Sequence, residues 1–257
     1  MAINLQSTAT IASSGVKVLV YGQAGSGKTT LIRTAPAPLI LSAEAGLLSL
    51  AGTDIPYVEI HSLAELSEVG AWIAQSQEAA QFKTICLDSI SEIAEVCLSE
   101  NKYTVDKHGN VTRNDGRLAY GDTNDQMVKV IRAFRDLPGK NVYFSAKLDK
   151  SESQDGARLF APAMPGKTLT QQLPYFFDEV LALRLVTDKD GNTIRALMCA
   201  PDTMWTAKDR SARLAAWEPA DLGALFDKIA GSEPRKIKGT SRAEAATARA
   251  QRDTEAK

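Results

Sequence analysis

Short apolar runs alternate with amphipathic segments through the first 150 residues of the chain. The apolar runs lie at 16–21, 38–44, 57–60, 84–88 and 141–146. Between them, apolar residues recur at helical spacing after Ser62, after Ser89 and over 122–137. This alternation predicts an α/β fold with a mainly parallel, twisted sheet flanked by helices. Two later runs, 176–186 and 193–200, flank the turn 190–192 and predict a C-terminal antiparallel hairpin that extends the sheet.

Two stretches, 102–121 and 147–166, follow no periodicity. They mix charged residues with glycines and aromatic residues, and they predict two long irregular loops. Loops of this length inside a compact domain are more often functional or mobile than filler. The pattern also predicts an N-terminal arm over 1–15, a core over 16–230 and a flexible charged tail over 231–257. The arm is either frayed or adds to the sheet edge of a neighbouring subunit.

Composition changes this picture little. The chain has 257 residues, 44% of them hydrophobic and 24% charged, and its net charge is −1, so any site for a polyanion must be local. Cys86, Cys97 and Cys199 lack the paired spacing of a metal site and are expected to be buried thiols. His61 and His108 stand alone, and we assign them no catalytic role. Without a signal-peptide pattern or a long apolar run, the sequence predicts a cytoplasmic protein without a membrane partner.

A glycine-rich turn joins the first apolar run to the first helical segment. Its sequence, Gly-Gln-Ala-Gly-Ser-Gly-Lys-Thr at 22–29, is a phosphate-binding loop in the strand–loop–helix context that the motif requires. Glycines let main-chain N–H groups converge on phosphate oxygens, and the start of the helix adds unpaired donors. Lys28 would reach the β- and γ-phosphates. We therefore expect ATP to be bound by Gly22, Gln23, Ala24, Gly25, Ser26, Gly27, Lys28, Thr29 and Thr30.

Two carboxylates end the apolar runs that follow the loop. Asp88 closes the run 84–88, from where it can hold Mg²⁺ together with the Thr29 hydroxyl. Glu44 closes the run 38–44, and in a parallel sheet the carboxyl ends of the strands gather at one edge. From that edge Glu44 can orient a water molecule for attack on the γ-phosphate.

These motifs resemble those of the RecA-type ATPases. Ala43-Glu44 is similar to the segment that carries their water-activating glutamate, and Asp88-Ser89 resembles the pair that closes their Mg²⁺-side strand. The AAA+ group places a glutamate directly after this aspartate, so Ser89 favours the RecA group. The chain is too short for the flanking domains of bacterial RecA. It looks like the core-only RecA-like proteins of bacteriophages, grouped with the Sak-type single-strand annealing proteins.

The resemblance implies a function and further site residues. In that group, ATP-linked assembly on single-stranded DNA supports recombination in the bacterial host cell, often beside a single-strand-binding protein. Lys147 stands where RecA relatives place a residue that senses the γ-phosphate. Lys208 and Arg210 resemble a Lys-x-Arg finger that reaches the next subunit's site, which implies a homo-oligomer, either ring or filament, with ATP between subunits.

The two irregular loops fall where RecA-type proteins contact DNA. Cations with interleaved aromatic rings suit a single strand, because charges meet phosphates and rings stack on bases. The candidate DNA-binding residues are Lys107, Arg113, Arg117, Lys150, Arg158, Phe160 and Lys167. Two alternatives stay open: a DnaB-like helicase or loader motor, and a nucleotide-gated replication adaptor with negligible turnover.

Overall fold

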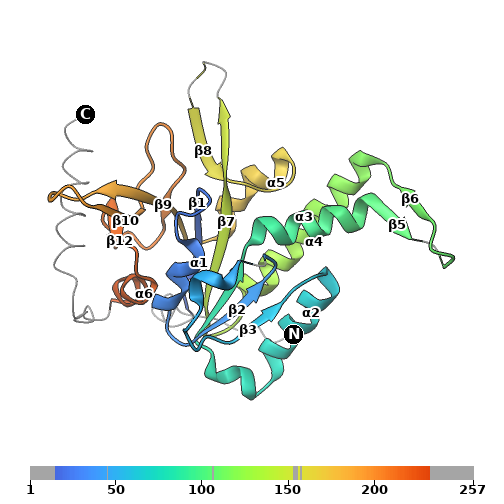
Figure 1. Ribbon diagram of the computed structural model, residues 1–257, viewed down its shortest axis with the longest axis horizontal. Coiled ribbons are helices and arrows are strands. Elements are labelled where there is room, and N and C mark those ends of the chain that lie inside the picture. The colour runs from blue at the N-terminus through green and yellow to red at the C-terminus, as the bar shows by residue number, and fades with distance from the viewer. Residues whose placement is uncertain (1–14, 45, 106, 153–155, 157, 232–257) are drawn as a thin grey trace, which may run out of the picture.

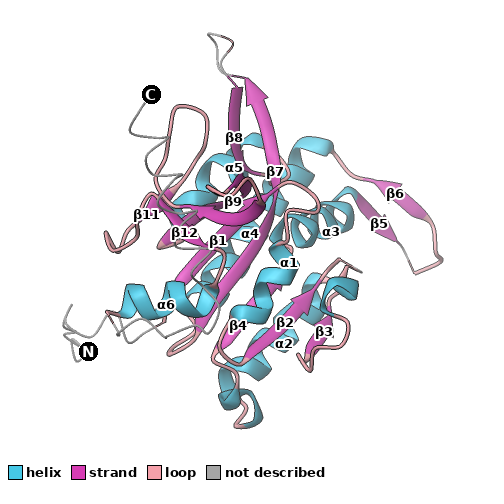
Figure 2. Ribbon diagram, turned by 60° about the vertical axis from the view of Figure 1, so that its left-hand side comes forward, coloured by secondary structure: helices cyan, strands magenta, loops and turns pink. Residues whose placement is uncertain are grey.

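A ten-stranded sheet runs through the computed structural model, with helices against both of its faces (Figures 1 and 2). The structure describes residues 15–231 except 45, 106, 153–155 and 157. The expected tail beyond 231 and all but the last residue of the expected arm therefore lie outside the described residues. Among the described helices, none has the length and hydropathy that crossing a membrane requires.

The sheet is parallel at its centre and antiparallel at one end. Its order is β12-β10-β9-β1-β7-β4-β2-β3, with β11 added to β9 and β8 added to β7. The pairs among β9, β1, β7, β4, β2 and β3 are parallel, and β9–β10 is the predicted C-terminal hairpin. The strands are β1 (Lys17–Gly22), β2 (Pro38–Ser42), β3 (Tyr57–Glu59), β4 (Thr84–Asp88), β5 (Tyr103–Val105), β6 (Val111–Arg113), β7 (Asn141–Glu152), β8 (Arg158–Pro162), β9 (Glu179–Thr187), β10 (Thr193–Met198), β11 (Lys208–Asp209) and β12 (Trp217–Pro219).

Most helices begin at a side-chain cap that the sequence offers. Ser62 and Ser89 accept hydrogen bonds from the main-chain N–H groups of Glu65 and Glu92, which fixes the starts of two of the longer helices. The α-helices are α1 (Lys28–Leu31), α2 (Leu63–Gln75), α3 (Ile90–Lys102), α4 (Gly116–Arg135), α5 (Lys167–Gln172) and α6 (Leu222–Ala230). The first helix is short because Ile32–Thr34 continues it as a 3-10 turn.

The core has two layers, one on each face of the sheet. Along β1, Leu19 and Tyr21 pack into the cluster under α2, α3 and α4, while Val18 and Val20 pack into the cluster under α1 and α6. A strand that is buried on both faces needs a continuous apolar run, which explains why β1 shows no polar alternation. The three cysteines are buried and free, as expected.

Both predicted irregular loops are wrong, because each contains a β-hairpin. In the stretch 102–121, β5 pairs with β6, and α4 already begins at Gly116 rather than near residue 122. In the stretch 147–166, β7 continues to Glu152 and pairs with β8. All residues of β5 and β6 are exposed, and the outer part of β7 leaves the core. Without a buried face, these strands carry no apolar alternation.

A buried carboxyl group joins the short strand β11 to the start of β9. Glu179 is 0% exposed, lies beside Asp209 and accepts a hydrogen bond from the Ser211 main-chain N–H (3.3 Å). Burial raises the pKa of Glu179 to about 8, and the neighbouring Asp209 contributes to that rise. The folded protein therefore keeps a proton here that the unfolded chain releases.

We predict that stability falls as the pH rises from about 5 to about 8, because the unfolded state binds fewer protons in this window. One proton changes the free energy of unfolding by at most about 1.4 kcal/mol per pH unit. Glu179→Gln removes this group and should flatten the pH dependence, which urea unfolding of both proteins between pH 5.5 and 8.5 measures. Parallel curves for the two proteins would contradict the assignment.

Candidate nucleotide site

The glycine loop follows β1 directly, at the carboxyl edge of the parallel strands. Gly25 and Gly27 have φ angles of +75° and +99°, which residues with a Cβ rarely adopt. A Cβ on Gly22 would lie 2.8 Å from both the Leu183 carbonyl oxygen and the Ser26 hydroxyl. Glycine is therefore required where the loop leaves the sheet and along its course. This main-chain path fits a bound phosphate chain.

Lys28 opens α1 and is held against the loop that it follows. Its ammonium group donates to the carbonyl oxygens of Gly22 (3.0 Å) and Gln23 (3.1 Å). Burial lowers the pKa of Lys28, and the charges of Asp88 and Glu44 oppose that shift. From inside the strand next to β1, Tyr143 donates to the Lys28 carbonyl oxygen (2.9 Å), which ties the start of the helix to β7.

Asp88 ends β4 and receives hydrogen bonds from two other elements. The Thr29 hydroxyl donates to Oδ2 (2.7 Å), and the Ser145 hydroxyl of β7 donates to Oδ1. The residue is 3% exposed, and burial raises the pKa of its carboxyl group, while the two hydroxyls oppose the rise. Mg²⁺ prefers oxygen ligands, and the hydroxyl and carboxylate oxygens of Thr29 and Asp88 meet here. The pair fits the predicted metal role.

Glu44 lies beside Asp88 because of the strand register. Ser42 of β2 pairs with Asp88 of β4, so Glu44 follows at the same edge. The Ser89 hydroxyl donates to Glu44 Oε1 (2.6 Å), and no hydrogen bond from a described residue reaches Oε2. One carboxylate oxygen is thus positioned by Ser89, and the other can accept a proton from water.

Lys147, Lys208 and Arg210, the predicted catalytic cations outside the loop, each contact residues other than those of the loop. Lys147 of β7 donates to Glu92 (2.6 Å) and Glu95 (3.2 Å) of α3. Burial lowers the pKa of Lys147, but the two carboxylates outweigh this effect, so the pKa lies above its usual value. Lys208 donates to the Pro174 carbonyl oxygen (2.7 Å), and Arg210 pairs with Asp178 (3.1 Å). These two lie near the start of β9, at the opposite edge of the sheet from the loop of the same subunit.

The candidate DNA-binding residues fall into two groups. Lys150, Arg158 and Phe160 line a hollow of about 490 Å³ on the β7–β8 hairpin, and Gln23 and Trp205 line it too. Trp205 stacks on Phe160, with 4.4 Å between the ring centroids. The remaining candidates lie on the β5–β6 hairpin or at helix starts; they are Lys107, Arg113, Arg117 and Lys167.

Sequence reasoning gave no role to several residues that contact the site. Ser145 shows only as a polar interruption of an apolar run, and Tyr143 is part of the run itself. Arg195 of β10 donates from Nε to the Ser26 carbonyl oxygen (2.8 Å) across 169 residues of sequence. No local pattern marks such a contact.

A glycine loop leading to Lys28 and Thr29, with Asp88 and Glu44 at neighbouring strand ends, defines a P-loop ATPase domain with a RecA-like sheet. Residues 14–211 match the family model AAA_24, described as an AAA domain. Because this match spans most of the chain, the protein belongs to that family.

Solved structures and curated sequences add little to this assignment. The chain is similar to a KaiC-like protein from the hyperthermophilic archaeon Pyrococcus horikoshii OT3, at 16% identity, over 72% of this chain and 78% of that one, with a TM-score of 0.38. A likeness at that score carries no argument, and the fold rests on the strand order itself. No curated protein sequence matches the chain significantly.

The arrangement would let these residues divide the work of ATP hydrolysis. Mg²⁺, when bound, would neutralise charge on the phosphate oxygens. Thr29 and Asp88 would hold the metal, the loop N–H groups and Lys28 would bind the phosphates, and Glu44 would take the proton of the attacking water.

We predict that Glu44→Gln lowers the turnover number by about 100-fold or more, because the amide cannot accept the proton. ATP affinity should stay within about threefold, because the amide can still bond to Ser89 and the phosphate contacts are untouched. Phosphate release and titration with ATP measure the two effects, with Glu65→Gln on the exposed start of α2 as the control. Turnover near the wild-type level would remove Glu44 from the mechanism.

Proposed function

We propose that this ATPase binds single-stranded DNA and promotes strand annealing or exchange, as an ATP-linked oligomer in the cytoplasm of a bacterial host cell. The resemblance to the core-only, Sak-type phage proteins suggests this role. The observation that carries it is the β7–β8 hairpin, which places Lys150, Arg158 and Phe160 beside Gln23 of the phosphate loop. A single-strand-binding protein acting on the same DNA is part of the proposal.

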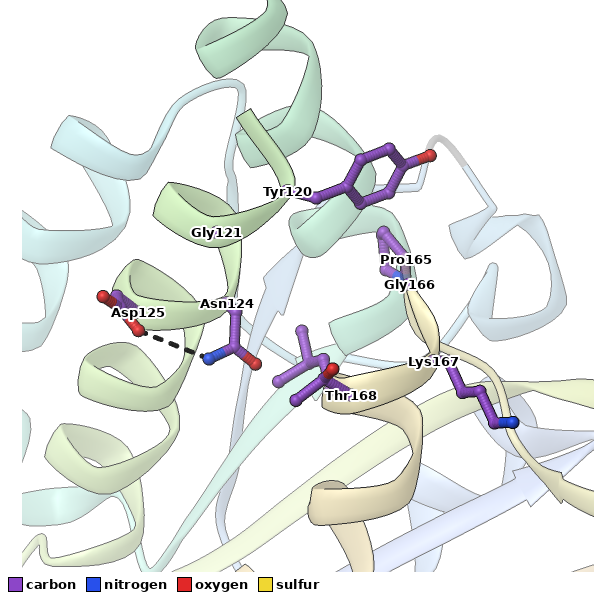
Figure 3. A pocket seen from close by; sticks show the side chains of 9 residues that line it. Tyr120, Gly121, Asn124, Asp125, Pro165, Gly166, Lys167 and Thr168 are labelled. Carbon is purple, nitrogen blue, oxygen red and sulfur yellow. Dashed lines mark hydrogen bonds between the residues drawn. The ribbon is translucent and has the colours of Figure 1, made fainter. Parts of the chain in front are cut away.

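The two hairpins extend away from the body of the molecule in both views (Figures 1 and 2). Their chains return to the core as α4 and as the segment before α5, and these two segments face one another. A pocket of about 500 Å³ lies between them (Figure 3). The two hairpins thus share a common base, where one strand of nucleic acid could meet both.

This pocket offers the groups that a nucleotide of a single strand would use. Tyr120 is 43% exposed, and Lys102 lies over its ring at 5.3 Å from the centroid. The Asn124 amide points toward Thr168 (Figure 3), and its buried Oδ1 has no hydrogen-bond partner among the described residues. Lys167 stands at the rim. An aromatic ring, an amide and two cations are the parts from which single-strand sites are built.

The hollow on the β7–β8 hairpin supports a link between DNA and ATP. Gln23, the second residue of the phosphate loop, lines it together with Lys150, Arg158, Phe160 and Trp205. A strand bound to this hairpin would therefore touch the loop itself. That contact supports hydrolysis that responds to DNA.

Assembly explains how Lys208 and Arg210 could serve the reaction. Both lie at the edge of the sheet opposite to the loop of their own subunit, so they can reach a phosphate chain only in a neighbouring subunit. A guanidinium group arriving from there would stabilise the charge that develops during phosphoryl transfer.

Three assays on the full chain test the function: ATP hydrolysis with and without single-stranded DNA, annealing of complementary oligonucleotides, and duplex unwinding. We expect hydrolysis that DNA stimulates and Lys28→Ala abolishes, and annealing without unwinding. ATP-driven unwinding would instead identify a helicase or loader motor. ATP binding with negligible turnover under all conditions would identify an adaptor.

We predict that the double substitution Lys150→Gln and Arg158→Gln weakens binding to a fluorescent oligonucleotide and lowers the salt dependence. Each lost phosphate contact removes about 0.7 from the slope of log K against log salt for a single strand. Lys83→Gln with Lys189→Gln removes the same charge from exposed sites elsewhere and is the control. Equal slopes for both variants and the wild type would argue against phosphate contacts on this hairpin.

We predict that Arg210→Ala lowers turnover by about 100-fold or more and leaves ATP binding intact. A mixture with Glu44→Gln subunits should regain part of the activity, because an Arg210→Ala subunit with an intact Glu44 receives an intact Arg210 wherever its neighbour is a Glu44→Gln subunit. Phosphate release measured against mixing ratio detects this recovery. A mixture that stays as inactive as its components contradicts a role between subunits.

A further inference from the structure

The Arg195 side chain contacts the phosphate loop at Ser26 and Gly27, although it belongs to β10, 169 residues after Ser26 in the sequence. A Cβ on Gly27 would stand 2.4 Å from Arg195 Nε, 2.9 Å from its Cδ and 3.2 Å from its Cζ. The Arg195 side chain therefore packs against the glycine that precedes Lys28. Its Nε donates to the Ser26 carbonyl oxygen (2.8 Å), which fixes its position.

Most of the hydrogen-bonding capacity of Arg195 remains available. A guanidinium has five N–H donors, and only Nε–H has a hydrogen-bond acceptor among the described residues. No described carboxylate forms a salt bridge with it, and the side chain is exposed. A positive charge with free donors thus stands against Ser26 and Gly27 of the loop. An anion bound by the loop would be its partner.

The sheet order indicates which end of a nucleotide this charge would meet. β7 and β4, which carry Ser145 and Asp88, lie on one side of β1, and β9 and β10 lie on the other. The Thr29–Asp88 contact marks the metal and γ-phosphate side. Arg195 approaches from the opposite side, where a nucleotide extended across the loop would have its α-phosphate and ribose.

We propose that Arg195 is a nucleotide-binding residue that holds the α-phosphate and ribose end of ATP. The β- and γ-phosphates are left to the loop N–H groups and Lys28. Arg195 then favours nucleotides over pyrophosphate, which has neither an α-phosphate nor a ribose, and contributes to ATP affinity more than to the chemical step.

Substitution of Arg195 distinguishes this role from mere support of the loop. Arg195→Gln should weaken the binding of ATP and ADP about 10- to 100-fold, as expected for a lost charged hydrogen bond. Binding of inorganic pyrophosphate, which can fill only the β- and γ-phosphate positions, should change by less than about threefold. In steady-state hydrolysis KM should rise, while kcat at saturating ATP stays within about threefold. Arg195→Lys keeps the charge but not the fork of donors, so its affinity for ATP and ADP should lie between those of the wild type and Arg195→Gln.

Calorimetric titration of the full chain with ATP, ADP and pyrophosphate in Mg²⁺ measures these affinities. Lys189→Gln, which removes an exposed cation from the turn of the same hairpin, is the matched control and should behave as the wild type. Equal weakening of all three ligands would show that Arg195 only shapes the loop and would overturn the proposal. Unchanged affinity, or a fall in kcat at constant KM, would overturn it as well. Circular dichroism and the melting temperature of both variants report whether the fold is kept.

Discussion

The Asp88 carboxylate fixes the parts of the site relative to one another. It is almost fully buried, and a buried charge is costly unless hydrogen bonds compensate it. The compensating donors, Thr29 and Ser145, come from the helix after the loop and from the strand between β1 and β4. The register of β2 on β4 then places Glu44 at the same edge. One desolvated group thereby sets where the phosphate loop, the metal ligands and the base stand.

The buried half of the fold could be predicted from sequence because burial leaves a pattern. Strands such as β1 and β4 are apolar between their ends because both of their faces are buried, and helices such as α2 and α3 begin at serine caps. The exposed hairpins leave no such pattern. In β5 and β6 every side chain faces solvent, and the polar end of β7 pairs only with β8. Main-chain hydrogen bonds hold these strands, and such bonds leave no apolar alternation in the sequence.

The candidate site was predictable where its chemistry is local. The loop 22–29 is one continuous motif, and Asp88 and Glu44 each follow an apolar run. Ser145 and Arg195 could not be found in this way, since their partners are 57 and 169 residues away in the chain. Such contacts depend on which strands become neighbours. That choice is made by the packing of the whole sheet and not by any short segment.

The indole of Trp205 occupies an unusual position between two hollows. It lines the one on the β7–β8 hairpin and also a second hollow of about 270 Å³ formed with Gln23–Ser26 and the end of β9. The Phe160 ring stacks on the Trp205 indole, and the Arg184 guanidinium lies 4.5 Å from the centroid of the same indole. The emission of an indole depends on such neighbours. A ligand that binds in either hollow would therefore change the fluorescence of Trp205, so this one residue reports on both the hairpin and the phosphate loop.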